Sequence, residues 1–324
     1  MKPYSSVLAL LLLCGAVRVS GQTIAYYHLD GAAGSNAVSL VDSGPSNITG
    51  TVQGAAVYAP GVLGNCLDLS GDLDYGVIPN SPSLTMTNDW TVEFFFKANL
   101  PYTINGFSPA LVNKIFTPNV GNSLSSYVCF LTDVGQLYLQ IGFSESSAVD
   151  LTPAAPINFA DGKWHHCAFS CHIGQTNTTF SLFGDYALLA SASGVYPPIL
   201  WANYPVYVGA GNFPNGQDNG QFRRNFDGQI DELRFSSVAL QPWQFIGAAY
   251  TNVTATISSI SGAVKLSSAT QTNRVYQVQA RPDLTSGTWT NLAVIMPGNG
   301  SPLFVTNAFV PGVTKQFFRV VTSH

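Results

Sequence analysis

The apolar residues of this chain occur almost everywhere in short runs bounded by Gly, Pro, Asn, Asp or Ser. Runs of this length with such boundaries are typical of β-strands separated by turns. Only residues 241–250 carry Trp243, Ile246 and Tyr250 at helical spacing, so a helix is expected there. The pattern therefore predicts an all-β sandwich, with strands at 23–29, 65–69, 75–78, 91–97, 127–131, 137–143, 164–169, 180–183, 205–209 and 230–235.

The first 21 residues have the pattern of a secretory signal peptide. Lys2 precedes an apolar run over residues 7–17, which is too short to span a bilayer, and small residues precede a cut site after Gly21. No later stretch is long and apolar enough to predict a membrane-spanning segment. We expect the mature protein to be secreted, either extracellular, on the cell surface or in the periplasm.

The charge content of the chain is low. Charged residues make up 9% of the sequence, Lys and Arg total 13 and are dispersed, and the formal net charge is -4. A nucleic-acid partner is therefore not expected, because such proteins carry clustered basic residues. The surface must be dominated by Ser, Thr, Asn, Gln and Gly, which favours neutral hydrogen-bonding partners such as polysaccharides or other glycans.

Four cysteines remain after the predicted signal peptide: Cys66, Cys129, Cys167 and Cys171. In an exported chain they allow two disulfides in three pairings, and the sequence does not decide between them. A direct bridge from Cys167 to Cys171 is disfavoured, because four residues of one extended strand separate them by about 13 Å. Equally, all four are interpreted as small apolar core residues.

Five blocks between residues 22 and 250 share the order and composition of a known module: Leu29-Asp30-Gly31, 61–71, 74–79, 89–97 and 161–168. Together they resemble the LamG-like (laminin G-like, concanavalin A-like) jelly-roll family. The resemblance implies a two-sheet jelly roll over residues 22–250. Two departures are Gly184-Asp185, where the family has Asp-Gly, and Cys167, where an aliphatic residue is usual.

Residues 251–324 have a different texture, with alternating apolar and polar residues in several runs and Pro-Gly, Ser-Gly and Gly-Asn-Gly turn sites. This segment resembles the small fibronectin-like or immunoglobulin-like modules at the ends of bacterial exported proteins. The expected organisation is a signal peptide over 1–21, the jelly roll over 22–250 and a small β-sandwich over 251–324.

A metal site is predicted from the strand that follows Asp227-Gly228. Alternation places Asp231 on the same face as Leu233 and Phe235, and a carboxylate on a core-facing side requires a partner. Asp30 ends the first strand, and in concanavalin A-like sandwiches the first and last strands are often neighbours. We therefore expect a structural calcium ion between Asp30 and Asp231. An equally favoured alternative is that both carboxylates accept backbone amide hydrogens at turns.

No catalytic constellation is recognised. The chain has three glutamates, Glu93, Glu145 and Glu232, and none belongs to the closely spaced acidic triplet of related glucanases. Adjacent His165 and His166 point to opposite faces of a strand, so they are interpreted as structural residues and not as ligands of one metal. The chain is therefore not expected to be an enzyme.

The segment 211–224 mixes aromatic rings with amide and guanidinium groups, a combination that suits sugar rings and hydroxyls. The predicted ligand-binding residues are Trp201, Phe213, Asn215, Asp218, Asn219 and Arg223. The alternative is a solvated loop whose aromatics pack into the core.

These observations predict a secreted, non-catalytic carbohydrate-binding or adhesive protein. A glycoside hydrolase or lyase on the same fold is the alternative, and a protein-binding structural component of the cell surface is the second alternative.

Overall fold

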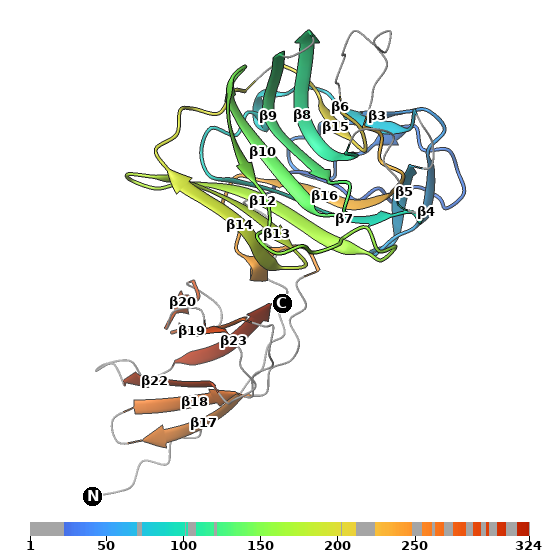
Figure 1. The fold of residues 1–324 in the computed structure, drawn as a ribbon. Helices are drawn as coiled ribbons and strands as arrows, with labels where there is room; N and C mark the ends of the chain where they lie inside the picture. Colours follow the sequence, from blue (N-terminus) through green and yellow to red (C-terminus); the bar gives the residue numbers. More distant parts are fainter. Residues whose placement is uncertain are drawn as a thin grey trace, which may run out of the picture. The chain divides into compact units, whose positions relative to one another are not determined.

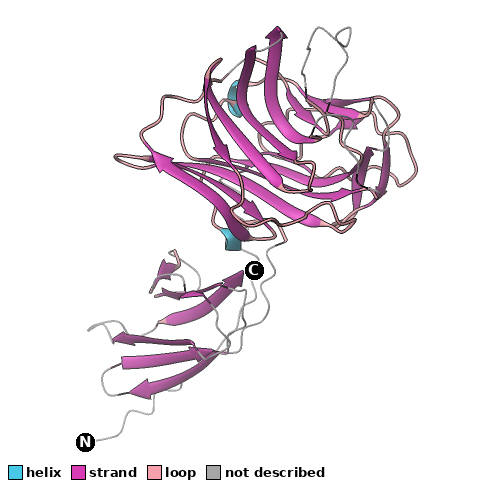
Figure 2. Ribbon diagram, in the orientation of Figure 1, coloured by secondary structure: helices cyan, strands magenta, loops and turns pink. Residues whose placement is uncertain are grey.

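The computed structural model describes residues 23–323 except 70–72, 101, 103–107, 120–121, 202, 212–223, 248–254, 261–262, 269–274, 283–287, 293–295, 298–302 and 309–315. The predicted signal peptide, residues 1–21, lies outside the described residues. The chain divides into two compact units, one spanning Val19–Ile246 and the other including Gly247–His324. The sequence-based boundaries at residues 22, 250 and 251 stay a prediction. Both units are built from antiparallel strands, which confirms the all-β class (Figure 2).

The larger unit consists of two sheets (Figure 1). The first sheet has the order β14 (Ala187–Gly194), β13 (Thr178–Gly184), β12 (His165–Ile173), β7 (Trp90–Ala98), β16 (Gly228–Ser236), β5 (Asn65–Leu69) and β4 (Val57–Pro60), with β1 (Thr23–Tyr27) paired to β16. The second sheet has the order β11 (Ser147–Leu151), β10 (Leu137–Ser144), β9 (Asn122–Leu131), β8 (Ala110–Asn119), β15 (Val206–Val208), β6 (Tyr75–Ile78), β3 (Gly50–Gln53) and β2 (Ser39–Leu40).

The core of this unit lies between the two sheets and is rich in aromatic side chains. Trp90 on β7 is fully buried, and its ring centroid lies 6.0 Å from those of Tyr127 on β9 and Phe169 on β12. Rings from both sheets thus interlock edge-on or tilted, which is the preferred geometry for aromatic pairs. This packing joins the sheets into one sandwich.

The smaller unit contains a three-stranded sheet of β17 (Ala255–Ile260), β18 (Ala263–Ser268) and β22 (Leu303–Ala308). A second sheet has the order β20 (Thr290–Asn291), β19 (Val275–Arg281) and β21 (Met296–Pro297), with β23 (Phe317–Ser323) paired to β19. Its own core cluster includes Leu266, Tyr276, Val278, Leu303 and Val305. No helix of the described chain has the length and apolarity needed to cross a membrane.

The helix predicted over residues 241–250 is wrong for the described part of that segment. One turn of 3-10 helix, η2 (Pro242–Gln244), is followed by Phe245 in extended conformation (φ -67°, ψ 154°). The next amide, that of Ile246, donates to Glu93 Oε2 at 2.7 Å instead of to a helical carbonyl. The hydrogen bond to Glu93 in the first sheet therefore takes the place of the helical hydrogen bond that the local spacing predicted. A second 3-10 turn, η1 (Pro82–Leu84), precedes β7.

The simple alternation predicted for β16 is also wrong. The register with β7 shifts between Asp231 and Arg234, and Glu232 has a positive φ of 54°. This bulge lets Ile230, Leu233 and Phe235 all enter the core cluster. Asp231 pairs with Phe95, which lies outside that cluster, so Asp231 is on the outer face of the first sheet and not on its core face.

Candidate functional site

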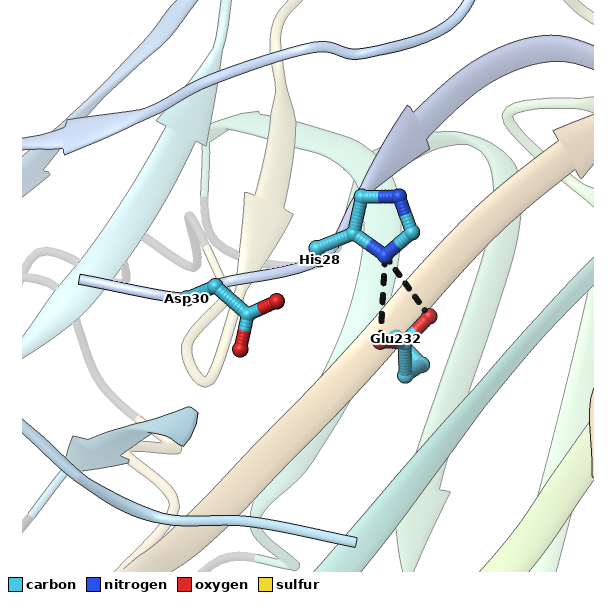
Figure 3. A group of neighbouring side chains, drawn as sticks. All are labelled: His28, Asp30 and Glu232. Carbon is cyan, nitrogen blue, oxygen red and sulfur yellow. Dashed lines mark hydrogen bonds and ion pairs between the residues drawn. The ribbon is translucent and has the colours of Figure 1, made fainter. Parts of the chain in front are cut away.

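Three side chains with metal-binding atoms meet where the chain leaves β1 and passes over β16 (Figure 3). His28 Nδ1 lies 3.1 Å from both carboxylate oxygens of Glu232. One ligand atom each from His28, Asp30 and Glu232 lie within 4.8 Å of one another. Among the described His, Cys, Asp and Glu side chains, this is the group with metal-binding geometry.

The β16 bulge positions Glu232 in this group. Because Glu232 adopts a left-handed backbone conformation, its side chain turns to the outer face while Leu233 stays in the core. The carboxylate is 2% exposed, whereas His28 is 42% exposed, so the group opens to solvent on the His28 side. Tyr26 also donates its hydroxyl to Glu232 Oε2, and burial together with this bond raises the pKa of Tyr26.

The two predicted calcium ligands, Asp30 and Asp231, hold one loop from two sides. Asp231 Oδ2 accepts the amides of Val62 at 2.7 Å and Leu63 at 3.2 Å. Asp30 Oδ1 accepts the amide of Asn65 at 2.6 Å. These contacts match the alternative prediction from the sequence, in which both carboxylates accept backbone amide hydrogens at turns.

Two glycines make this arrangement sterically feasible. A Cβ at Gly61 would lie 2.5 Å from Asp231 Oδ2, and a Cβ at Gly64 would lie 2.1 Å from Asp30 Oδ1. Gly64 in addition has a φ of 78°, a conformation that L residues with a side chain rarely adopt. The block 61–71 therefore carries its glycines so that the loop can approach the carboxylates.

The second carboxylate oxygen of Asp231 makes no such contact. Its Oδ1 is buried and has no hydrogen-bond partner among the described residues. Burial raises the pKa of Asp231 to about 7, against the lowering effect of the Leu63 and Val62 amides. Free carboxylate oxygens suit Ca²⁺, and the nitrogen of His28 suits Zn²⁺. His28, Asp30 and Glu232 thus fit a bound cation, and Asp231, the other predicted calcium ligand, is not part of this group.

A second candidate region lies on the outer face of the second sheet. Tyr127, Cys129 and Leu131 of β9 and Leu137, Leu139 and Ile141 of β10 face the core. The alternate positions therefore face outward, among them Phe130, Tyr138 and Gln140. We call Phe130, Tyr138, Gln140, Asp150 and Arg224 the aromatic face.

The members of the aromatic face contact one another. The rings of Phe130 and Tyr138 stack with centroids 4.4 Å apart and an interplanar angle of 25°. The guanidinium carbon of Arg224 lies 5.3 Å from the Phe130 centroid, and Gln140 Nε2 donates to Asp150 Oδ1 at 2.9 Å. Burial, followed by the Asp150 carboxylate, raises the pKa of Tyr138. Two half-buried rings thus lie beside an amide, a carboxylate and a guanidinium.

The predicted ligand residues are only partly covered by the structure. Trp201 packs on the rim of the core, with its ring centroid 6.3 Å from Trp90 and 6.5 Å from Tyr127. Phe213, Asn215, Asp218, Asn219 and Arg223 lie outside the described residues. Arg224, which directly follows them, belongs to the aromatic face, and its carbonyl accepts the Ala110 amide at 2.8 Å. Phe130 and Tyr138 were missed, although their outward position follows from the alternation of residues 127–131 and 137–143.

The buried acid Glu93 has a different environment. Its Oε1 accepts Arg234 Nε at 2.8 Å, and its Oε2 accepts the Ile246 amide and lies 3.1 Å from His166 Nε2. Burial alone would raise its pKa, but His166 and Arg234 outweigh burial and lower it. His165 faces other partners, since its ring nitrogens lie 2.9 Å from Asp161 and 2.8 Å from Asp185.

The comparison with family models identifies the class of this fold. The model Laminin_G_3, described as the concanavalin A-like lectin/glucanases superfamily, matches residues 70–244, more than half of the chain. The chain belongs to this superfamily, which confirms the LamG-like resemblance. No curated protein matches the sequence.

Several solved structures are similar to this chain at low sequence identity. The binding domain of Paraclostridial Mosquitocidal Protein 1 is 12% identical, with a TM-score of 0.52 over 84% of this chain and 63% of that one. The binding domain of botulinum neurotoxin serotype D is 13% identical, with a TM-score of 0.50 over 84% and 69%. Domain 4 of the arabinanase AbnA from Geobacillus stearothermophilus, solved with arabinotriose, is 21% identical, with a TM-score of 0.47 over 69% and 96%.

Proposed function

We propose that this protein is a secreted, non-catalytic carbohydrate-binding or adhesive protein that binds a glycan on the aromatic face. The observation that carries the proposal is the stacked pair Phe130 and Tyr138 beside Gln140, Asp150 and Arg224. Membership of a superfamily that contains lectins supports it. Arg224 directly follows the segment 211–223, which carries five of the ligand residues predicted from the sequence.

The chemistry of the aromatic face matches a neutral sugar. The apolar face of a pyranose or furanose ring packs on an aromatic ring, and the stacked rings supply that surface at small entropic cost. Sugar hydroxyls both donate and accept, which suits a carboxylate and an amide. With 9% charged residues, the chain offers little long-range attraction to a highly charged polymer.

A binding role is favoured over catalysis by the state of the glutamates. Glu93 is fully buried and engaged by Arg234, His166 and the Ile246 amide, so it has no access to a glycosidic bond. Glu232 accepts the Tyr26 hydroxyl and contacts His28. A hydrolase or lyase on this fold stays the rival function, because Asp30 and Glu232 form a close carboxylate pair.

The proposed cofactor is a structural calcium ion at the edge formed by Asp30, Asp231 and Glu232. Support comes from the unpartnered Asp231 Oδ1 and from the proximity of Asp30 to Glu232. When bound, the ion would supply positive charge that offsets the repulsion among these carboxylates. It would stabilise the contact between β1, β16 and the loop at 61–65.

The aromatic face is tested by binding of the purified chain to a panel of soluble polysaccharides, followed by calorimetry on any that bind. Tyr138→Ala and Phe130→Ala are expected to weaken binding at least about tenfold, a loss of about 1.4 kcal/mol. Tyr196→Ala is the matched control, because Tyr196 belongs to another stacked pair, with Phe143 at 5.3 Å. Equal losses in all three variants would refute the placement of the site.

Release of reducing ends from any polysaccharide of the panel would contradict the non-catalytic proposal. Asp30→Asn and Glu232→Gln would then identify the carboxylates responsible. Absence of binding to all glycans, together with specific capture of an extracellular protein, would favour the structural cell-surface role.

A further inference from the structure

The four cysteines of the described chain are all buried, but two of them meet across the core. Cys129 on β9 belongs to the second sheet, and Cys167 on β12 belongs to the first. Their sulfur atoms lie 3.8 Å apart. Both side chains are 0% exposed and belong to the same core cluster.

We propose that Cys129 and Cys167 form a disulfide that links the two sheets of the jelly roll. The sulfurs need to approach by about 1.8 Å to reach the S–S bond length of about 2.05 Å. Cys167 stands opposite Phe94 on β7 and Gly184 on β13, and Gly184 presents no Cβ there. Because Phe159 and Leu189 fill the space beside Gly184, rotation of the two cysteine side chains toward each other would supply this approach.

The other two cysteines have different surroundings. Cys66 Sγ lies 3.6 Å from the Pro60 carbonyl oxygen. Cys171 pairs with Trp90 and Phe180 in the first sheet, four residues along the same strand from Cys167. Of the pairings left open by the sequence, the geometry therefore selects Cys129 with Cys167 and leaves Cys66 and Cys171 as core thiols.

The chemistry requires an oxidant, for which a small-molecule disulfide such as oxidised glutathione is sufficient. Two cysteine thiols lose two electrons and two protons as their S–S bond forms, and the oxidant's S–S bond breaks to give two thiols. Only the thiolate attacks, and burial together with Cys129 raises the pKa of Cys167 well above its usual value. The bond is therefore made while the chain folds, before the core closes, and the folded reduced protein resists oxidation.

The inference rests on the proposed export for its relevance in the cell, but it is tested without export. The full chain is unfolded, reduced and refolded with a mixture of reduced and oxidised glutathione. Peptide mapping under non-reducing conditions is expected to give one crosslink, between the peptides of Cys129 and Cys167. Four free thiols at positions 66, 129, 167 and 171, or a crosslink to Cys66 or Cys171, would overturn the proposal.

Stability gives a second readout. The bond closes a loop of 39 residues from Cys129 to Cys167, and its formation is expected to raise the Tm of the larger unit by roughly 5 to 15 °C over the reduced form. Cys129→Ala should abolish the response of the Tm to reductant, while Cys66→Ala should retain it. A wild-type Tm that is unchanged by reduction of the mapped bond would contradict a stabilising role. Glycan binding is scored separately, so failure of one proposal does not imply failure of the other.

Discussion

Glu93 is the residue whose substitution tests the packing of the larger unit most directly. It is fully buried and accepts hydrogen bonds from Arg234 and from the Ile246 amide, with His166 Nε2 at 3.1 Å. Glu93→Gln keeps the shape of the side chain but removes its charge. Arg234, which is 12% exposed, would then be left as a nearly buried cation without a counter-charge.

Loss of one partner of a buried ion pair costs about 3 to 5 kcal/mol. For a unit of this size, each kcal/mol lowers the Tm by about 2 to 4 °C, so Glu93→Gln is expected to lower it by roughly 6 to 20 °C. Differential scanning calorimetry measures this shift. Glu145→Gln, on an exposed turn, is the matched control and should change stability by less than about 0.5 kcal/mol.

The pH dependence has a defined sign. Because the pKa of Glu93 is lowered in the folded state, its contribution is fully present above the unfolded value of about 4.3 and is lost as the pH falls through the folded value. The difference in free energy of unfolding between the wild type and Glu93→Gln should therefore disappear only at acid pH. The double variant Glu93→Gln/Arg234→Gln should cost less than the sum of the two single variants, since it leaves no unpaired charge. A shift below 2 °C for Glu93→Gln, or strict additivity, would refute this reasoning.

Two further predictions concern the proposed cation site at His28, Asp30 and Glu232, and His165 on β12. Chelation is expected to lower the Tm, and added calcium is expected to restore it. Asp30→Asn and Glu232→Gln should remove this response, whereas the exposed control Asp133→Asn should keep it. Restoration by zinc alone would indicate a zinc ion bound through His28, and a Tm unaffected by chelation would exclude a bound ion. The pKa of His165 is raised because Asp185 and Asp161 outweigh the lowering effect of burial, so its stabilisation is present below about pH 6.5 and lost as the pH rises through the folded value. Asp185→Asn should weaken the pH dependence of the free energy of unfolding, measured by urea unfolding between pH 6 and 8. An unchanged pH profile would show that groups other than His165 cause this dependence.

The sequence was sufficient to predict the fold class because β-strands can be recognised from short stretches of sequence. Runs such as 137–143 and 164–169 are short, rich in apolar residues and followed by Ser, so they predict strands without reference to their partners. Strands β2, β3, β4, β8, β11 and β14 of the larger unit were not expected. In β14 the residues are mostly small and exposed or half-buried, and its pairing with β13 supplies the order that the local pattern lacks.

The helix expected over 241–250 failed for a tertiary reason. Its local spacing is helical, but the Ile246 amide donates to Glu93, which is 153 residues away in sequence. A buried carboxylate is a stronger acceptor than a peptide carbonyl, and no local pattern reveals it.

For the candidate sites too, the sequence predicted some features and the tertiary structure decided the others. The sequence by itself identified Asp231 as a carboxylate that needs a partner, Asp30 as a candidate for that partner, and a charge-poor polar surface. Only the tertiary structure decided which atoms meet: the bulge at Glu232 turns that residue toward His28 and Asp30, and the pairing of β9 with β10 stacks Phe130 on Tyr138. Strand alternation has a fixed period that one extra residue reverses, and cross-strand neighbours depend on register, so these contacts are set by pairing between distant segments and not by local composition.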